Sequence, residues 1–232
     1  MGTSTAQGTS RSFLAGLFFI TSATLLLEIL NTRLLSVVTW YHLSFFAVSM
    51  AMFGMAAGAL WVYLKPLKFP REDAFGSLYR YSIFFALSTL VCHLIILFTP
   101  LSTLEGWGAV NLLKMTLITL AVAIPFAFSG VVVTIALTQV PGNSGLIYAV
   151  DLIGAALGSL ACLALLSVLD ISSATIASTV VTVLAILFFQ RAKTGRSDLR
   201  WVALAAALTI GAFVNSQLTG GLRVFYPKGN EV

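Results

Sequence analysis

Charged side chains are scarce in this sequence: 13 Lys and Arg and 8 Asp and Glu make up 9% of its 232 residues. Soluble domains carry about 25% charged and about 45–50% apolar residues. Here 59% of the chain is apolar, and the mean hydropathy is +0.99. So few charges cannot give a globule of this size a water-compatible surface. The composition excludes a soluble enzyme, a disordered chain and a disulfide scaffold, and it predicts that most of the chain lies in lipid.

Cysteine and histidine are equally scarce. Cys92 and Cys162 both fall inside apolar runs, so they do not indicate a disulfide framework. With only His42 and His93 besides, a Cys/His zinc site is not expected, and we predict no metal and no cofactor. The two histidines could also be axial ligands of haem. No sequence pattern flanks either of them, so haem is only a minor alternative.

The net charge of +5 and the pI near 9.5 do not indicate nucleic-acid binding. The basic residues lie in short loops between apolar runs, which is the ordinary charge bias of membrane proteins. We therefore expect the chain to have the lipid bilayer, and no nucleic acid, as its partner.

The apolar residues form seven runs, and a helix that crosses the bilayer core needs about 20 residues. The predicted fold is all-α, a polytopic membrane helix bundle of about seven transmembrane helices. We divide the chain into an N-terminal tail (1–12), a transmembrane domain (13–218) and a short C-terminal tail (219–232). The predicted spans are Phe13–Leu35, Leu43–Leu64, Tyr79–Phe98, Leu112–Leu137, Leu146–Leu169, Ser172–Phe189 and Trp201–Gln217. Pro125 predicts a kink in the fourth span.

Lys and Arg residues are distributed unequally between the two predicted sides. The side of the N-terminus holds nine: Arg11, Lys65, Lys68, Arg71, Arg80, Arg191, Lys193, Arg196 and Arg200. The other side holds four: Arg33, Lys114, Arg223 and Lys228. By the positive-inside rule the N-terminus is cytoplasmic, in a multi-pass protein of the inner (plasma) membrane. Seven spans then place the C-terminus outside.

Polar residues recur at helical spacing in the first span. They are Thr21, Thr24, Glu28, Asn31 and Thr32. A polar stripe is costly against lipid, so we expect it to face the bundle interior or a water-filled cavity. Glu28 either hydrogen-bonds neighbouring helices or binds a cationic or hydrogen-bonding ligand, and both readings stay open. Arg33 lies about 140° around the helix from Glu28, so it is expected at the interface or beside another helix.

The fifth span carries Asp151 on a face shared with Tyr148, Gly154 and Gly158. Glycines four residues apart let two helix backbones approach closely, so Gly154 and Gly158 predict helix packing. The second span repeats this device with Gly54 and Gly58. Asp151 is expected to point into the bundle, as a packing group or as a ligand contact. Its predicted depth differs from that of Glu28 by roughly 10–15 Å.

Several segments form a more specific pattern than helix packing requires. They are Leu27–Ile29 with Arg33–Ser36, Gly54 with Gly58, Pro125–Phe126 with Ser129–Gly130, and above all the run Tyr148–Ser159. Together these segments resemble the membrane domain of integral-membrane spermidine synthase-like proteins, which are relatives of polyamine aminopropyltransferases. In that family the membrane module is usually joined to a Rossmann-like domain that binds decarboxylated S-adenosylmethionine. The glycine-rich loop of such a domain is missing here, so we do not expect this chain to catalyse aminopropyl transfer on its own.

The leading hypothesis is a membrane module that binds a small ligand, with a polyamine as one candidate, or that anchors a separate catalytic partner. Its predicted ligand-binding residues are Glu28 and Asp151, facing amines, with Asn31, Arg33 and Tyr148. A small-molecule or proton-coupled transporter is the second hypothesis, because of Pro125 and the intramembrane carboxyls. An accessory subunit of a larger membrane complex is the third.

Overall fold

A computed structural model describes residues 10–38, 42–99, 109–196 and 198–217. This part contains seven α-helices, all long and apolar enough to cross a membrane, and no strand, which confirms the predicted fold class. They are α1 (Arg11–Val38), α2 (His42–Leu64), α3 (Ala74–Phe98), α4 (Ala109–Thr138), α5 (Ser144–Leu166), α6 (Ile171–Thr194) and α7 (Leu199–Gln217). Most of both predicted tails and the loop 100–108 lie outside the described residues.

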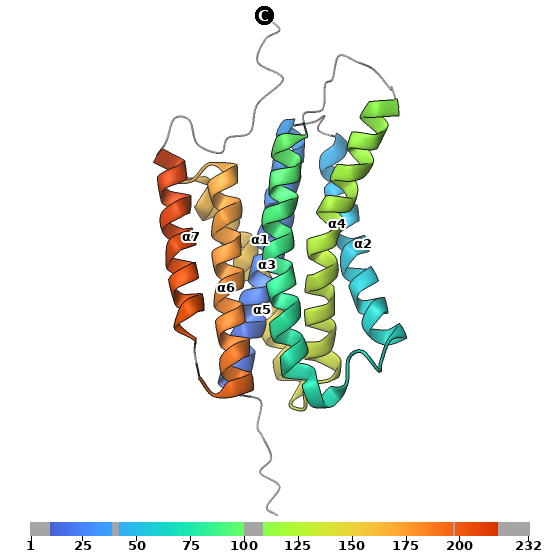
Figure 1. Cartoon of the computed structure of the whole chain (residues 1–232), viewed down its shortest axis with the longest axis vertical. Helices are drawn as coiled ribbons and strands as arrows, with labels where there is room; N and C mark the ends of the chain where they lie inside the picture. Colours follow the sequence, from blue (N-terminus) through green and yellow to red (C-terminus); the bar gives the residue numbers. More distant parts are fainter. Residues whose placement is uncertain (1–9, 39–41, 100–108, 197, 218–232) are drawn as a thin grey trace, which may run out of the picture.

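The chain runs up and down through the bundle, so that α1, α3, α5 and α7 point one way and α2, α4 and α6 the other (Figure 1). Helix α1 is central and packs against α5, α6 and α2, while α3 lies between α4 and α6. Helix α7 packs mainly on α6, and most of its side chains are exposed. Helices α2, α5 and α7 have the most exposed side chains, so they form the periphery that lipid would cover.

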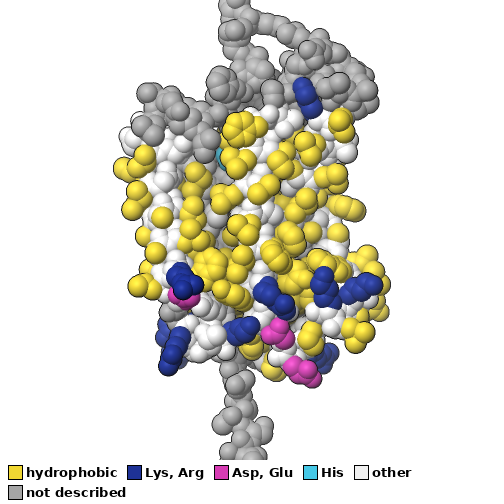
Figure 2. Space-filling view, viewed as in Figure 1, with side chains coloured by type: hydrophobic (Ala, Val, Ile, Leu, Met, Phe, Trp, Pro, Cys, Tyr) yellow, Lys and Arg dark blue, Asp and Glu magenta, His cyan; other side chains and the backbone are white. Residues whose placement is uncertain are grey.

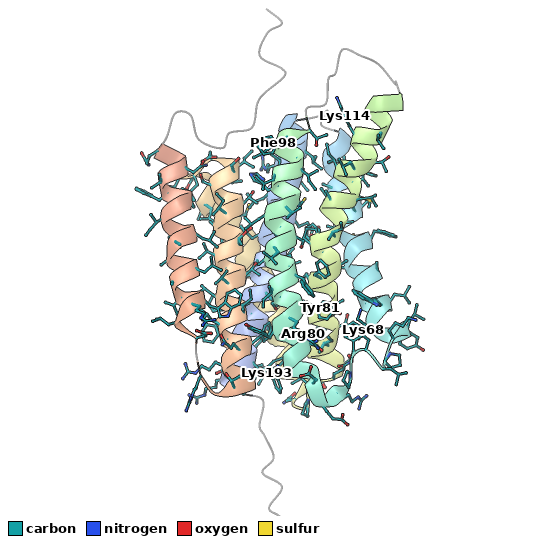
Figure 3. The ribbon with its side chains drawn as sticks, viewed as in Figure 1. Lys68, Arg80, Tyr81, Phe98, Lys114 and Lys193 are labelled. Atoms are coloured by element: carbon teal, nitrogen blue, oxygen red, sulfur yellow. The ribbon has the colours of Figure 1, made fainter. Side chains whose placement is uncertain are left out.

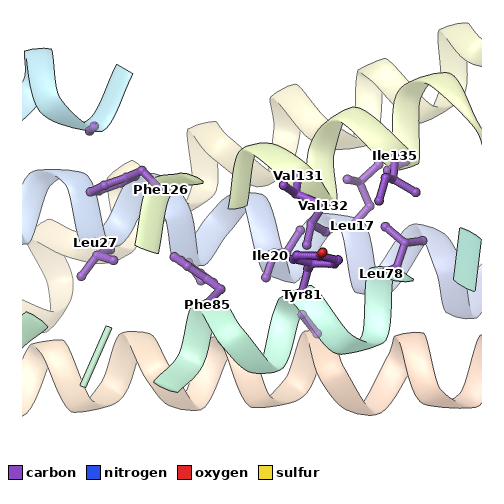
Figure 4. Packing of buried hydrophobic residues seen from close by; sticks show 14 of the residues in the cluster. Leu17, Ile20, Leu27, Leu78, Tyr81, Phe85, Phe126, Val131, Val132 and Ile135 are labelled. Atoms are coloured by element: carbon purple, nitrogen blue, oxygen red, sulfur yellow. The ribbon is translucent and has the colours of Figure 1, made fainter. Parts of the chain in front are cut away.

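The main core lies where α1, α3 and α4 meet (Figure 4). Phe126 of α4, Phe85 of α3 and Leu27 of α1 are at most 2% exposed and belong to one cluster. Helix α4 continues through Pro125, the position where we predicted a kink. Because proline has no N–H, the carbonyl of Ala121 loses its helical hydrogen-bond donor there.

Two helix ends lie five residues outside the predicted spans, while the others lie within three residues of them. Helix α3 begins at Ala74, five residues before the predicted start, after a 3₁₀ turn (η1, Arg71–Asp73). Helix α6 continues beyond Phe189 to Thr194, where its last basic residues are exposed. Cations at a helix C-terminus are favourable to the helix dipole. The helix then stops at Gly195, whose left-handed φ of 71° suits a helix end.

A short hairpin joins α5 to α6, and Asp170 caps the start of α6. Its carboxylate accepts a hydrogen bond from the backbone N–H of Ser173 at 3.3 Å. Asn143 caps α5 in the same way, with its side-chain oxygen 3.0 Å from the N–H of Gly145. Such caps satisfy backbone donors that the helix leaves free at its first turn.

Glycines hold two pairs of helices at backbone contact. A Cβ added at Gly154 or Gly158 of α5 would collide with α1, at the backbone of Phe18 or Ser22. A Cβ at Gly54 or Gly58 of α2 would collide with backbone carbonyls of α4, and one at Gly130 of α4 would collide with Met55 of α2. The hydroxyl of Ser22 also donates to the carbonyl of Gly154 at 2.8 Å. The structure therefore places all four predicted packing glycines at helix–helix contacts.

Basic side chains gather at one end of the bundle (Figure 2). We call this the basic end, and its residues are Arg11, Lys65, Lys68, Arg71, Arg80, Arg191, Lys193, Arg196 and Arg200. The helix order puts Arg33 and Lys114, the other described basic residues, toward the opposite end. The charge asymmetry predicted along the sequence is thus a difference between the two ends of the molecule.

Candidate functional site

The polar stripe of α1 lies mainly inside the bundle. Thr21, Thr24 and Asn31 are buried, and Glu28 and Thr32 are half-buried. The hydroxyl of Thr24 donates to the carbonyl of Ile20 at 2.8 Å and lies 2.5 Å from the hydroxyl of Ser129 on α4. The threonines of the stripe therefore have partners, and their polarity is accounted for by helix structure and packing.

Glu28 and Asn31 differ from these threonines because they have unpaired polar groups. Within the described part of the chain, the Glu28 carboxylate has no hydrogen bond and no ion pair. Asn31 is 3% exposed, and its amide nitrogen is buried with no hydrogen-bond partner among the described residues. Residues three apart lie on neighbouring positions of one helix face. An isolated charge inside the membrane costs at least about 2.5–3.5 kcal/mol, which a bound cation would offset.

Asp151 lies at a different depth in the bundle from Glu28. It is half-buried on α5 and also lacks a hydrogen bond or ion pair within the described residues. Helices α1 and α5 run parallel, and Gly158 is level with Ser22. At 1.5 Å per residue, Asp151 and Glu28 are then about 20 Å apart in depth. The separation exceeds the predicted 10–15 Å because the glycine contact sets this register, so the two carboxylates do not form one compact site.

Tyr148 and Arg33, the other two predicted ligand-binding residues, lie on the outside of the bundle. Tyr148 is 55% exposed, so it does not share the buried face of Gly154 and Gly158. Arg33 is exposed and has no ion pair with a described residue. The structure brings only Glu28 and Asn31 together among the five predicted residues.

Sequence reasoning missed a second set of unpaired polar groups. His93 of α3 is 4% exposed, and neither ring nitrogen has a hydrogen-bond partner among the described residues. The hydroxyl of Ser172, at the start of α6, is also buried and has no partner in the described ranges. The available signal was the spacing of Ser82, Thr89 and His93, which puts them on one face of α3. In sequence, His93 suggested only a haem ligand, and the side chain of His42 lies outside the described residues.

Replacing His93 with leucine is expected to stabilise the bundle by about 1 kcal/mol, because a buried polar group without a partner costs about 1–3 kcal/mol. The measurement is unfolding of the detergent-solubilised protein by added SDS, followed by circular dichroism. Thr89→Val is the control, since the Thr89 hydroxyl donates to the Phe85 carbonyl at 2.8 Å in the ordinary helical way. A clear loss of stability in His93→Leu alone would show that the imidazole is bonded in the native protein.

No group of three or more His, Cys, Asp and Glu in the described ranges could hold a metal ion. Comparison with known proteins finds no matching family model, no matching curated protein and no matching solved structure.

Proposed function

We propose that this chain is a multi-pass membrane module that binds an amine-bearing small molecule at Glu28 and Asn31. The observation that carries the proposal is that the Glu28 carboxylate and the Asn31 amide, one helical turn apart, both lack partners within the part of the chain that the structure describes. A protonated amine supplies both the positive charge and the N–H donors that a carboxylate accepts. The resemblance to spermidine synthase-like membrane domains names polyamines as the ligand class.

The proposed setting is the inner membrane, with the N-terminus in the cytoplasm. Nine of the eleven described Lys and Arg residues lie at the basic end, which is the end of the bundle where α1 begins. Because cytoplasmic loops carry the excess of Lys and Arg, the basic end faces the cytoplasm in this proposal. The Glu28 level is then in the half of the bilayer away from the cytoplasm.

Glu28→Gln is expected to weaken spermidine binding by roughly 10-fold to 100-fold, because hydrogen bonds to charged groups are worth about 1.5–3 kcal/mol. Calorimetry on the protein in lipid nanodiscs at low ionic strength measures the affinity. Glutamine keeps the size of the side chain and removes only its charge. Asp151→Asn is the matched control: it also removes one intramembrane carboxylate, about 20 Å away in depth, and is expected to bind as the unaltered protein does.

Equal affinity in Glu28→Gln and the unaltered protein would contradict the proposal. Loss in Asp151→Asn with full binding in Glu28→Gln would place the site on α5 instead. Recovery of the protein in mild detergent only together with a second polypeptide would favour the accessory or anchoring role.

Transport of the same ligand is the second candidate function. It is favoured by Pro125, which leaves the buried Ala121 carbonyl of α4 without its helical donor. Freed carbonyls in the middle of spans bind substrates or ions in several transporter folds. Uptake of labelled spermidine into proteoliposomes, driven by a pH gradient, would support transport, and binding without uptake would leave a binding module.

A further inference from the structure

The short connection between α2 and α3, residues 65–73, places exposed basic and apolar side chains next to each other (Figure 3). Lys65, Lys68 and Arg71 are exposed, and none has a carboxylate partner within the described part of the chain. The one ion pair of this region joins Arg80 to Asp73 at 3.0 Å. Glu72 is the only other acidic residue of the connection. With Asp73 paired to Arg80, the three cations therefore leave the connection with a net positive charge.

The connection is held in place by aromatic packing. Phe69 is 2% exposed, and its ring centroid lies 5.8 Å from that of Trp61 and 5.4 Å from that of Tyr81. Lys68 extends over Trp61, with its ammonium nitrogen 4.5 Å from the ring centroid. Backbone hydrogen bonds such as that from Lys68 to the Lys65 carbonyl, at 2.9 Å, close the turns. The three cations therefore occupy a defined position rather than a free loop.

Large apolar side chains project from the same place. Leu67 is 97% exposed, and Tyr63 and Leu64, at the end of α2, are 80% and 60% exposed. Such side chains are unfavourable in water and suit the boundary between lipid tails and headgroups, where tyrosine and tryptophan gather. The connection thus presents large apolar side chains beside its cationic ones.

We propose that residues 65–71 form a binding site for an anionic phospholipid, whose phosphate lies among Lys65, Lys68 and Arg71. The adjoining Leu64 and Leu67 pack against its acyl chains. An acidic protein would match the cations but would leave the apolar side chains in water, so the observations favour a lipid. This site is independent of the amine site at Glu28, which lies in the opposite half of the bundle.

The test compares two triple variants in nanodiscs that contain equal amounts of phosphatidylglycerol and phosphatidylcholine, with native mass spectrometry to count the lipids that stay bound. Lys65→Gln, Lys68→Gln and Arg71→Gln together remove the proposed site. Arg191→Gln, Lys193→Gln and Arg196→Gln remove the same charge from the same end of the bundle, at the last turn of α6 and just after it. Both should elute as folded monodisperse protein, because all six side chains are exposed.

We expect the unaltered protein and the α6–α7 variant to retain phosphatidylglycerol in preference to phosphatidylcholine. Each basic residue near a headgroup contributes about fivefold to binding at low salt, so the 65/68/71 variant should retain at least tenfold less phosphatidylglycerol. Equal losses in both variants would overturn the proposal, because they would indicate a diffuse charge effect. No preference for the anionic lipid in the unaltered protein would overturn it as well. Retention of an acidic protein in place of lipid would also overturn it.

Discussion

Gly158→Leu is expected to separate α5 from α1 and to destabilise the protein by more than about 3 kcal/mol, the upper end of the usual range for overpacked cores. Even one methyl group at Gly158 would collide with the backbone of Ser22, and a backbone cannot move aside as a side chain can. Helix α5 has no comparable contact elsewhere, because it packs mainly on α1 and most of its surface is exposed. The thermal unfolding temperature in mild detergent measures the loss.

Gly211→Leu is the control for this experiment. Gly211 lies on α7, and a Cβ there would meet nothing within 4 Å. The added leucine would face lipid, so Gly211→Leu should not destabilise the protein, and its higher helix propensity should add up to about 1 kcal/mol of stability. Similar melting temperatures for Gly158→Leu and Gly211→Leu would show that α5 is not held by the glycine contact.

The fold was predictable because the bilayer imposes a length and a composition on each helix. All seven helices fall on the predicted apolar runs. The helix ends at Ala74 and Thr194 were not predictable from hydropathy, since they lie among charged residues. Hydropathy also does not show which helices pair. The parallel contact of α1 with α5 depends on the close approach of backbones at Gly154 and Gly158. The sequence identifies these glycines as packing positions but does not show which helix they contact.

The candidate site was predictable only in part, for a related reason. The spacing in α1 places Glu28 and Asn31 on one helix face, because that depends on a single helix. Whether Tyr148 faces the bundle depends on the orientation of a whole helix, which the tight contact of α5 with α1 decides. The burial of His93 likewise follows from the packing of α3 between α4 and α6.

Alanine at Gly58 and at Gly130 should destabilise the protein by about 1–3 kcal/mol each, but the double variant should lose clearly less than the sum. Both glycines belong to the contact between α2 and α4: a Cβ at Gly58 would meet the Ala127 carbonyl, and one at Gly130 would meet the Met55 backbone. Once the first methyl group has pushed the helices apart, the second finds space. Alanine is also the better helix former by about 1 kcal/mol, which partly offsets each loss.

A double-mutant cycle in SDS unfolding measures this coupling, which for residues in one contact amounts to about 0.5–3 kcal/mol. Gly158→Ala combined with Gly58→Ala is the matched comparison. These two glycines lie in different helix pairs, so their effects should add within about 0.5 kcal/mol. Full additivity between Gly58 and Gly130 would mean that each glycine is needed for its own helix rather than for a shared contact. Strong coupling between Gly58 and Gly158 would instead mean that the two helix pairs form and separate as one unit through α1 and α4.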